Sequence, residues 1–526
     1  MIMGGAYAQN GMIFGMNQFQ TTDMLSLSRF DYSLSTARSR AMGGAFASLG
    51  ADLSSMSINP AGLAMYRGGE VGITTTINST HVNVRPLNGN SFAYRGENFR
   101  TKLTLDNLGF TVNGRQSSGA LTSVQWGFGY NKLADLNYRH AVETTPDQYS
   151  VGELFVEALN GFDYGQGMPL SWLPNSARPF RNNNIDPWYW NSILAYKTFM
   201  VDGEEVGFGS RYFINDQSTL SPDDMKSHYS YLESEGSIGE YLVSGAFNFR
   251  NRVYFGFSLS LLSIWNEKYF SYEEEYPRYP QGPHALYKMQ YNQAMSSNGV
   301  GFGAKIGVIV RPIDPLRIGL AFHTPQMVTL NTRYRAEMYT RFTMGLEPGY
   351  SNTDNLEYDY EYSSPPRLLA GISYTFGNWG ILSADYEAVW YNGMRSMDSD
   401  MGYRDLVRGN VKADFKTAHN FRIGAEVKPL PALALRGGLG FMGSALKDEL
   451  AVFDNPAPFR SYIASAGIGW RSKGGTSVDF TYTFNRTSQS VYDQYYDAYY
   501  DGGIYSGDIK TYLYRNFFTL SLSQRF

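Results

Sequence analysis

At the end of the chain, from Arg515 to Phe526, apolar and polar side chains largely alternate. At the two-residue period of a β-strand, each kind falls on one face. The apolar face carries Phe518, Leu520, Leu522 and Phe526, and the polar face carries Thr519, Ser521, Ser523 and Arg525. A two-faced strand that ends the chain on an aromatic residue is typical of the closing strand of a bacterial outer-membrane β-barrel. An ordinary last strand of a sheet has the same local pattern, so recurrence upstream decides between them.

The same alternation recurs through most of the chain after Gly69. It is clearest in residues 124–130, 206–209, 255–261, 318–323, 421–427 and 478–485. One face of these segments is large and mostly aromatic, whereas the other is glycine, serine or charged. A soluble β-sandwich shows some alternation, but it does not keep its large face so aromatic while the other face stays small and polar. We therefore predict an all-β fold, a transmembrane antiparallel β-barrel with an apolar outer surface and a polar interior.

Composition supports this prediction. Aromatic residues make up 16% of the chain and charged residues 17%, whereas typical globular chains have about 25% charged residues. No apolar run reaches the roughly 18 to 20 residues that a transmembrane helix needs, so a membrane protein of this sequence must close its sheet to satisfy every backbone group. The absence of cysteine excludes disulfides, thiolate metal sites and a catalytic cysteine.

Short turns and long connections set the expected strand number. Seven short turns are expected near residues 113–118, 201–203, 250–252, 311–315, 376–378, 429–431 and 471–475. Seven short turns that link eight hairpins in series predict about sixteen strands within 69–526. The long polar connections at 133–189, 269–293 and 486–509 are then extracellular, and the short turns are periplasmic.

The N-terminal region differs from the rest. Residues 1–8 end in Ala6-Tyr7-Ala8 before Gln9, as at a signal-peptide cleavage site, and we expect them to be the end of a signal whose start lies upstream. Residues 9–68 are rich in small side chains, with a short helix expected before Gly43-Gly44. Asn59-Pro60 is a turn or helix-start signal. About sixty such residues bury too little core to fold alone, which favours packing inside something else.

The segment from Ala41 to Tyr66, with Gly43, Gly44 and Asn59-Pro60-Ala61, resembles the N-terminal region of the FadL/TodX family of outer-membrane hydrophobic-compound transporters, and the versions found in Bacteroidota are most similar. The resemblance implies that residues 9–68 form a plug in the lumen of a barrel spanning 69–526. It also implies long-chain fatty acids or other apolar ligands, captured among extracellular loops and released through a lateral opening in the wall. The family barrel has fourteen strands, so the expected number is 14–16.

Charge patterning agrees with a plug. The residues expected on the lumen face include charges of both signs: Arg211, Lys305, Asp385, Glu387, Arg422, Glu426, Arg436 and Asp479. The plug segment itself carries Asp31, Arg38, Arg40 and Asp52. A fatty-acid carboxylate must meet a cation, so Arg38, Arg40, Arg422 and Arg436 are candidates for ligand binding or for anchoring the plug. A water-filled pore lined by mixed charges is the alternative to a plug.

Motifs for chemistry are weak. The six histidines include no HExxH motif and no pair at i,i+4, and His323 is expected to be a lumen residue and nothing more. No GxSxG motif occurs either, so no catalytic residues, metal site or cofactor is expected. A net charge of −4 gives no support for nucleic-acid binding. The Tyr- and acid-rich segments 272–279 and 492–503 suit a headgroup-level aromatic girdle or, at loop tips, an envelope protein partner.

These expectations lead to two functions. The first is an integral outer-membrane channel for passive uptake of hydrophobic small molecules in a Gram-negative bacterium. The second is a barrel subunit of a larger outer-membrane secretion or assembly complex. An apolar route from the loops to the plug favours the first, and a filled lumen with covered loop tips favours the second.

Overall fold

The computed structural model describes residues 21–86, 92–93, 98–116, 119–144, 150–161, 167–173, 180, 185–207, 209–214, 226–276, 286–343, 347–447, 459–493, 498–500, 503–505 and 508–526. The expected signal end at residues 1–8 and the first plug residues, 9–20, lie outside this part of the chain.

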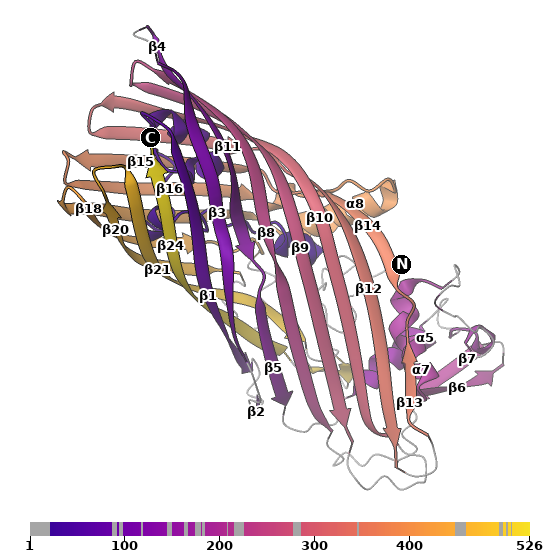
Figure 1. The fold of residues 1–526 in the computed structure, drawn as a ribbon. Coiled ribbons are helices and arrows are strands. Elements are labelled where there is room, and N and C mark those ends of the chain that lie inside the picture. The colour runs from indigo at the N-terminus through magenta and orange to yellow at the C-terminus, as the bar shows by residue number, and fades with distance from the viewer. Residues whose placement is uncertain are drawn as a thin grey trace.

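The main sheet is a closed antiparallel β-barrel of fourteen wall strands (Figure 1). Three wall strands are interrupted and consist of two elements each. In order around the wall the elements are β1 (Glu70–Pro86), β3 (Phe99–Gln116), β4 (Leu121–Asp135) with β5 (Tyr138–Thr144), β8 (Ser227–Phe249), β9 (Val253–Glu275), β10 (Leu286–Ile313), β11 (Leu316–His323) with β12 (Met327–Phe342), β14 (Leu356–Ser363) with β15 (Arg367–Phe376), β16 (Gly380–Trp390), β18 (Thr417–Leu430), β19 (Leu433–Met442), β20 (Ser461–Arg471), β21 (Thr476–Asp493) and β24 (Asp508–Arg525).

The predicted closing strand is confirmed. β24 pairs with β1 from Glu70↔Arg525 to Pro86↔Ile509, and the backbones of Gly69 and Phe526 exchange hydrogen bonds of 2.8 and 3.0 Å. Phe518, Leu520 and Leu522 are exposed on the outer face while Thr519 is fully buried. A strand whose two faces meet lipid and a packed lumen must alternate in this way.

The expectation of sixteen strands was too high, because one expected turn does not belong to the wall. Residues 201–203 lie inside β6 (Val201–Val206), which pairs only with β7 (Gly209–Ile214) in a separate two-stranded sheet. Arg211 is therefore exposed on β7 and does not line the lumen. The other six turns join twelve wall strands, and β1 and β24, which begin and end at the same rim, complete fourteen.

Smaller elements complete the described chain. The short strands are β2 (Phe92–Ala93), β13 (Gly349–Asn352), β17 (Arg395–Ser396), β22 (Ala498–Tyr500) and β23 (Gly503–Tyr505). The helices are α2 (Thr21–Ser26), α3 (Ala37–Ala41), α4 (Ser55–Ile58), α5 (Val151–Asn160), α7 (Trp190–Lys197) and α8 (Met401–Asp414), with 3-10 turns η1 (Pro60–Met65), η2 (Leu170–Trp172), η4 (Pro187–Tyr189) and η5 (Tyr391–Gly393). Among the residues described, no helix combines the length and the apolar character needed to cross a membrane.

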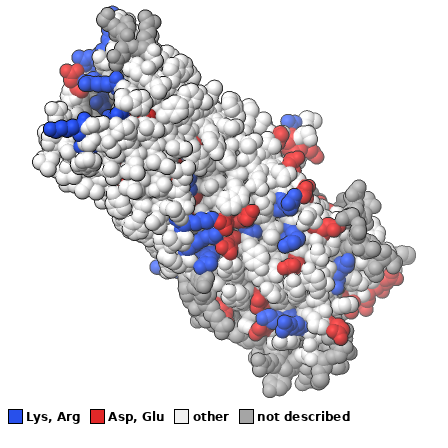
Figure 2. Space-filling view, in the orientation of Figure 1, with Lys and Arg blue, Asp and Glu red and all other residues white. Residues whose placement is uncertain are grey.

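The outer surface divides into a membrane belt and an extracellular extension. On β9 the large exposed side chains from Val253 to Trp265 are apolar, and Glu273 and Glu275 follow further along the strand. Figure 2 shows the same division, with few charged side chains over a band next to the turn-bearing rim and many beyond it. β8, β9 and β10 have 23, 23 and 28 residues, more than twice the 9–11 that cross a membrane. The halves of these strands farther from the periplasmic turns therefore form a wall outside the membrane, on its extracellular side.

Residues 21–68 lie inside the barrel, where Figure 1 shows the indigo helices enclosed by the wall. Most of their side chains are buried, and those of α2, α4 and η1 join two apolar clusters with lumen-facing residues of the wall. A segment with so many small residues has a core only because the wall supplies the other half of it.

Candidate functional site at the plug and a split in the wall

The Asn59-Pro60-Ala61 motif fixes the plug against β9 and β10. The Asn59 side chain accepts a hydrogen bond from the Ala61 amide (3.1 Å) and donates one to the Ala47 carbonyl (2.6 Å). Pro60 starts η1, where its missing N–H costs nothing. The motif lies so close to the wall that a Cβ on Gly256 would come within 2.3 Å of the Pro60 backbone, and one on Gly307 would collide with Asn59 Oδ1.

Five further glycines of the wall lie similarly close to the plug, and together with Gly256 and Gly307 we call them the glycine belt. Each faces the lumen at a point where a Cβ would overlap the plug: Gly319, Gly371, Gly424, Gly438 and Gly467. On the plug side, Gly43 and Gly44 have φ of 63° and 79°, a left-handed conformation that glycine adopts without strain. They end α3 and let the backbone lie against β19, since a Cβ on Gly43 would stand 2.9 Å from the Leu439 carbonyl oxygen.

Buried charges on the wall hold the plug backbone. Glu387 pairs with Arg422 (2.8 Å) and Arg367 (3.2 Å), and Arg367 donates to the Ser28 carbonyl of the plug (2.7 Å). Lys305 pairs with Glu240 (2.7 Å) and donates to the Ser57 carbonyl (3.0 Å). The predicted lumen positions Lys305, Glu387 and Arg422 are thus confirmed as buried and inward-facing.

Two further residues that were expected to face the lumen, Asp385 and His323, each make contact with the backbone of the plug. Asp385 is buried and accepts a hydrogen bond from the Ala47 amide at 2.7 Å. His323, also expected in the lumen, is buried with Nε2 2.9 Å from the Ile58 carbonyl oxygen. Both residues therefore contact the plug backbone directly.

Arg38 and Arg40 are separated by the structure, although both lie in α3. Arg38 points to the periplasmic end, where it shares Glu426 with Arg436 at 3.1 and 2.6 Å; Arg436 also pairs with Asp479 at 2.5 Å. Arg40 points to the opposite side and is 1% exposed. There it pairs with Asp106 at 2.7 Å.

The wall is split beside Arg40. β3 pairs with β1 from Phe99 to Thr111, but it pairs with β4 only from Asn107 onward, opposite Asn131. In the described part of the chain, residues 99–106 therefore have no ladder partner on the β4 side. Asp106 is an extra residue in β3, because Thr74 pairs with Asn107 and Thr75 with Leu105. A bulge of this kind bends a strand and ends its pairing.

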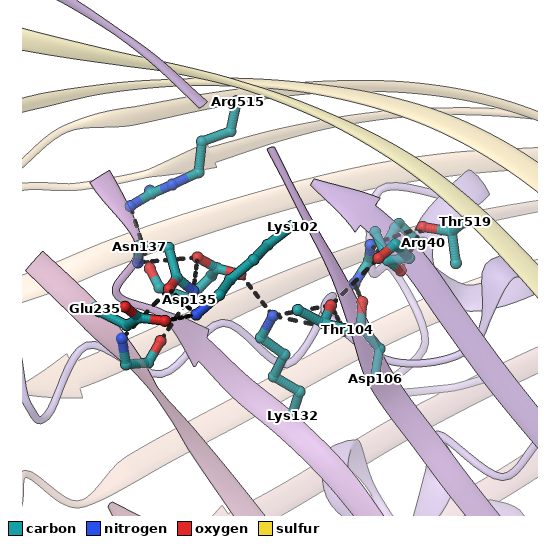
Figure 3. Close-up of polar contacts among 12 residues, drawn as sticks. Arg40, Lys102, Thr104, Asp106, Lys132, Asp135, Asn137, Glu235, Arg515 and Thr519 are labelled. Carbon is teal, nitrogen blue, oxygen red and sulfur yellow. Dashed lines mark hydrogen bonds and ion pairs between the residues drawn. The ribbon is translucent and has the colours of Figure 1, made fainter. Parts of the chain in front are cut away.

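Polar side chains connect the two sides of the split (Figure 3). Lys132 on β4 donates to Thr104 of β3 (3.2 Å) and Asp135 (2.6 Å), and its ammonium lies 3.6 Å from Asp106. Lys102 on β3 donates to Asn137 (3.2 Å) and pairs closely with Glu235 of β8. We call these residues, with Arg40, the latch. It joins the wall at the split by side chains, and it reaches the plug through Arg40.

The latch was missed in the sequence, although a signal exists. Large apolar residues stand at 103 and 105 and then at 108 and 110, so the outward phase shifts by one residue at Asp106-Asn107. A shift of phase within a strand marks a bulge. What the sequence cannot give is the set of partners, which come from α3, β4 and β8.

The extracellular half of the lumen is filled on one side by an apolar insertion. α5 and α7 pack against inner faces of β9, β10 and β12 through residues such as Phe155, Ile193 and Tyr291. Tyr272 and Tyr276, expected in a girdle or at a partner surface, are buried here instead. Segment 492–503, the other tyrosine-rich segment, has no described side chains.

Glu274 on the extracellular part of β9 holds the start of α5. It accepts hydrogen bonds from the Val151 amide (2.6 Å) and from the hydroxyls of Ser150 (2.7 Å) and Tyr276 (2.9 Å). Burial alone raises the pKa of Glu274, but His228 and these hydrogen bonds outweigh it, so the pKa lies below its usual value.

Substitution of Glu274 by glutamine is expected to loosen α5 by about 1–3 kcal/mol, the cost of leaving buried donors unsatisfied. Hydrogen exchange at residues 151–160 measures this as faster exchange, with Glu275→Gln, an exposed neighbour, as the unchanged control. Because the folded pKa is depressed, the wild-type contact is present above the usual glutamate pKa and is lost only as the pH falls through the lower folded value. Equal exchange in all three proteins would show that Glu274 does not hold α5.

A plugged, closed barrel with an apolar outer belt is an integral outer-membrane protein. No family model and no curated protein sequence matches the chain. Its fold is that of the FadL/TodX transport proteins. A Pseudomonas aeruginosa FadL homologue superimposes with a TM-score of 0.54 at 11% identity, over 93% of this chain and 98% of that one. A deltaS2 mutant of the TodX monoaromatic hydrocarbon channel gives 0.51 at 13% identity, over 94% and 100%. The Ralstonia pickettii toluene transporter TbuX gives 0.48 at 13%, over 95% and 100%.

Proposed function

We propose that this barrel is a passive channel for hydrophobic small molecules, such as long-chain fatty acids, which leave its lumen sideways through the split between β3 and β4. The observation that carries the proposal is the run of β3 residues, 99–106, that pairs with β1 alone within the described chain. A closed ladder gives an apolar molecule no way through a barrel wall, whereas a boundary held by side chains separates without breaking backbone pairs.

The surroundings of the split support a lateral route. On the outer surface of the barrel at the split, Leu103 and Leu105 face the lipid, with 72% and 41% of their surface exposed. The fold supports an apolar cargo, since the similar structures include a protein described as a monoaromatic hydrocarbon channel and one described as a FadL homologue. An apolar solute that enters the bilayer gains about 25 cal/mol for each Å² it removes from water, so no other energy source is required.

The four arginines proposed from the sequence serve, in this proposal, as plug anchors and not as carboxylate receptors. Arg38 and Arg436 share Glu426, Arg40 pairs with Asp106, and Arg422 pairs with Glu387. A guanidinium that already faces a carboxylate at 2.6–3.1 Å gains little from a second one. The Asn59-Pro60-Ala61 motif and Gly43-Gly44 belong to the same anchoring system, with residues 9–68 as the plug and 69–526 as the barrel.

A cross-link across the split tests the proposal. The chain has no cysteine, so Thr104→Cys with Lys132→Cys provides a unique pair for a short bis-maleimide. Cross-linking is expected to lower the uptake of radiolabelled oleate by cells about tenfold, because a gate that cannot open limits the rate. Toluene uptake, measured in parallel, decides between acyl and aromatic cargo.

The matched control places the same cross-link where the wall is already closed. Asn107 and Asn131 are ladder partners whose side chains touch at 3.4 Å, so Asn107→Cys with Asn131→Cys should tolerate cross-linking with uptake unchanged. Undiminished uptake in the cross-linked Thr104/Lys132 variant would refute lateral release at this split.

A further inference from the structure

A polar cavity of about 540 Å³ lies at the periplasmic end of the lumen. The plug residues Ala51 and Met65 form its inner wall, and the ends of β11, β18, β19 and β20 surround it. Trp470, which lines the cavity, is 50% exposed on the outer face. Such aromatic residues mark the level of the membrane interface, so the cavity lies near the phosphates of the inner leaflet.

The lining is strongly cationic. Eight of the residues around the cavity are Lys or Arg, and two, Glu426 and Asp479, are carboxylates. Figure 2 shows Lys and Arg outnumbering acids at this rim, at the upper left. The two carboxylates are already occupied, Glu426 by Arg38, Lys428 and Arg436, and Asp479 by Arg436. Positive charge therefore remains in excess inside the cavity.

The excess is located on two arginines. Arg317 on β11 makes no ion pair with any described residue, and its Nε is buried without a hydrogen-bond partner. Arg471, at the end of β20, donates from Nε to the Ser477 hydroxyl at 2.9 Å and makes no ion pair within the described chain. Arg317 is half-buried, and a guanidinium partly withdrawn from water without an anion is costly, whereas Arg471 is exposed at the mouth of the cavity. The planar fork of arginine fits phosphate oxygens two at a time.

We propose that this cavity binds a phosphate group, with Arg317 and Arg471 as its main ligands and Arg38 as the link to the plug. The group belongs either to the headgroup of an anionic phospholipid of the inner leaflet or to a small soluble phosphate. In either case an anion enters where the wall strands end and neutralises charge that the protein leaves unpaired. The site is separate from the split, since the cavity is lined by the opposite side of α3 from Arg40.

The test uses the full-length protein in phosphate-free detergent, titrated with inorganic phosphate and followed by calorimetry and thermal unfolding. Binding is expected to weaken about tenfold for each guanidinium removed in Arg317→Gln and Arg471→Gln, the loss expected for a hydrogen bond between charged groups. Arg317→Lys should retain part of the affinity. Arg333→Gln, on the extracellular wall, should leave it unchanged.

A second arm distinguishes the two sources. Native mass spectrometry of protein released from phosphatidylglycerol nanodiscs is compared with protein from phosphatidylcholine nanodiscs. Retained phosphatidylglycerol that disappears in the Arg317→Gln/Arg471→Gln variant identifies a lipid headgroup, and phosphate binding without retained lipid identifies a soluble ligand. The proposal is overturned if chloride at equal ionic strength stabilises as much as phosphate, or if the double variant matches the wild type in both arms.

Discussion

Replacement of Gly438 by alanine is expected to displace the plug and to destabilise the barrel, whereas the same change at Gly437 is expected to do neither. A Cβ on Gly438 would lie 2.1 Å from the Gly43 nitrogen and 2.2 Å from the Met42 carbonyl carbon. Both are backbone atoms, so no side-chain rotation relieves the overlap. Overpacking of this kind costs about 1–3 kcal/mol, and more where backbone must move.

Gly437 provides the matched control because it is the adjacent residue on the other face of β19. A Cβ there meets only the Ser465 carbonyl oxygen, at 3.9 Å. The stability of the barrel is measured as the temperature at which the folded form disappears on a gel. Displacement of the plug is measured by hydrogen exchange of residues 38–48. If Gly438→Ala leaves plug exchange as slow as in the wild type, the plug is not held by close approach to the glycine belt.

The barrel was predictable because its strongest determinant is local. Phe421 faces lipid and Arg422 faces the lumen, and any strand between those two environments must alternate at period two. Six of the expected turns fall between the wall strands for the same reason, since a short turn needs only its own residues. The closing strand and the inward position of Glu387 could therefore be read from the sequence.

The count of sixteen, the upper end of the expected 14–16, was too high because a short hairpin outside the wall has the same kind of local sequence as a hairpin of the wall. The turn expected at 201–203 lies inside β6 (Val201–Val206), and the strand alternation expected at 206–209 falls where that hairpin turns toward β7 (Gly209–Ile214), at Gly207 with a φ of 63°. Whether such a hairpin joins the wall depends on pairing with residues far away in the chain, which period-two alternation does not encode.

The arginines that anchor the plug also show that a local sequence pattern does not encode long-range pairing. Arg38 and Arg40 were both plausible ligand or anchor residues by type, but α3 directs them to opposite sides of the lumen, toward Glu426 and Asp106. The phase shift at Asp106 marks the bulge, yet the partner of Asp106 lies 66 positions away in the chain. Long-range pairing of this kind follows from barrel closure and not from any local motif.

Substitution of Asp106 by asparagine is expected to cost about 3–5 kcal/mol, the usual penalty for removing one partner of a buried ion pair. Arg40 and Asp106 are each 1% exposed, and Lys132 loses the same anion at 3.6 Å. Under the proposed lateral release, the same change should raise oleate uptake, because it removes the charge that joins plug, β3 and β4. Chemical unfolding and uptake rates are measured on the same preparations.

Asp385→Asn is the matched control, because it alters a buried lumen carboxylate that also contacts the plug, at the Ala47 amide, but lies on β16 away from the split. It should destabilise the protein without raising uptake. Arg40→Gln added to Asp106→Asn should restore part of the lost stability, since the unpaired charge is then gone. If both aspartate variants raise uptake equally, the plug as a whole controls passage. If Asp106→Asn destabilises the barrel and leaves uptake unchanged, the latch only braces the wall, and the route out of the lumen lies elsewhere.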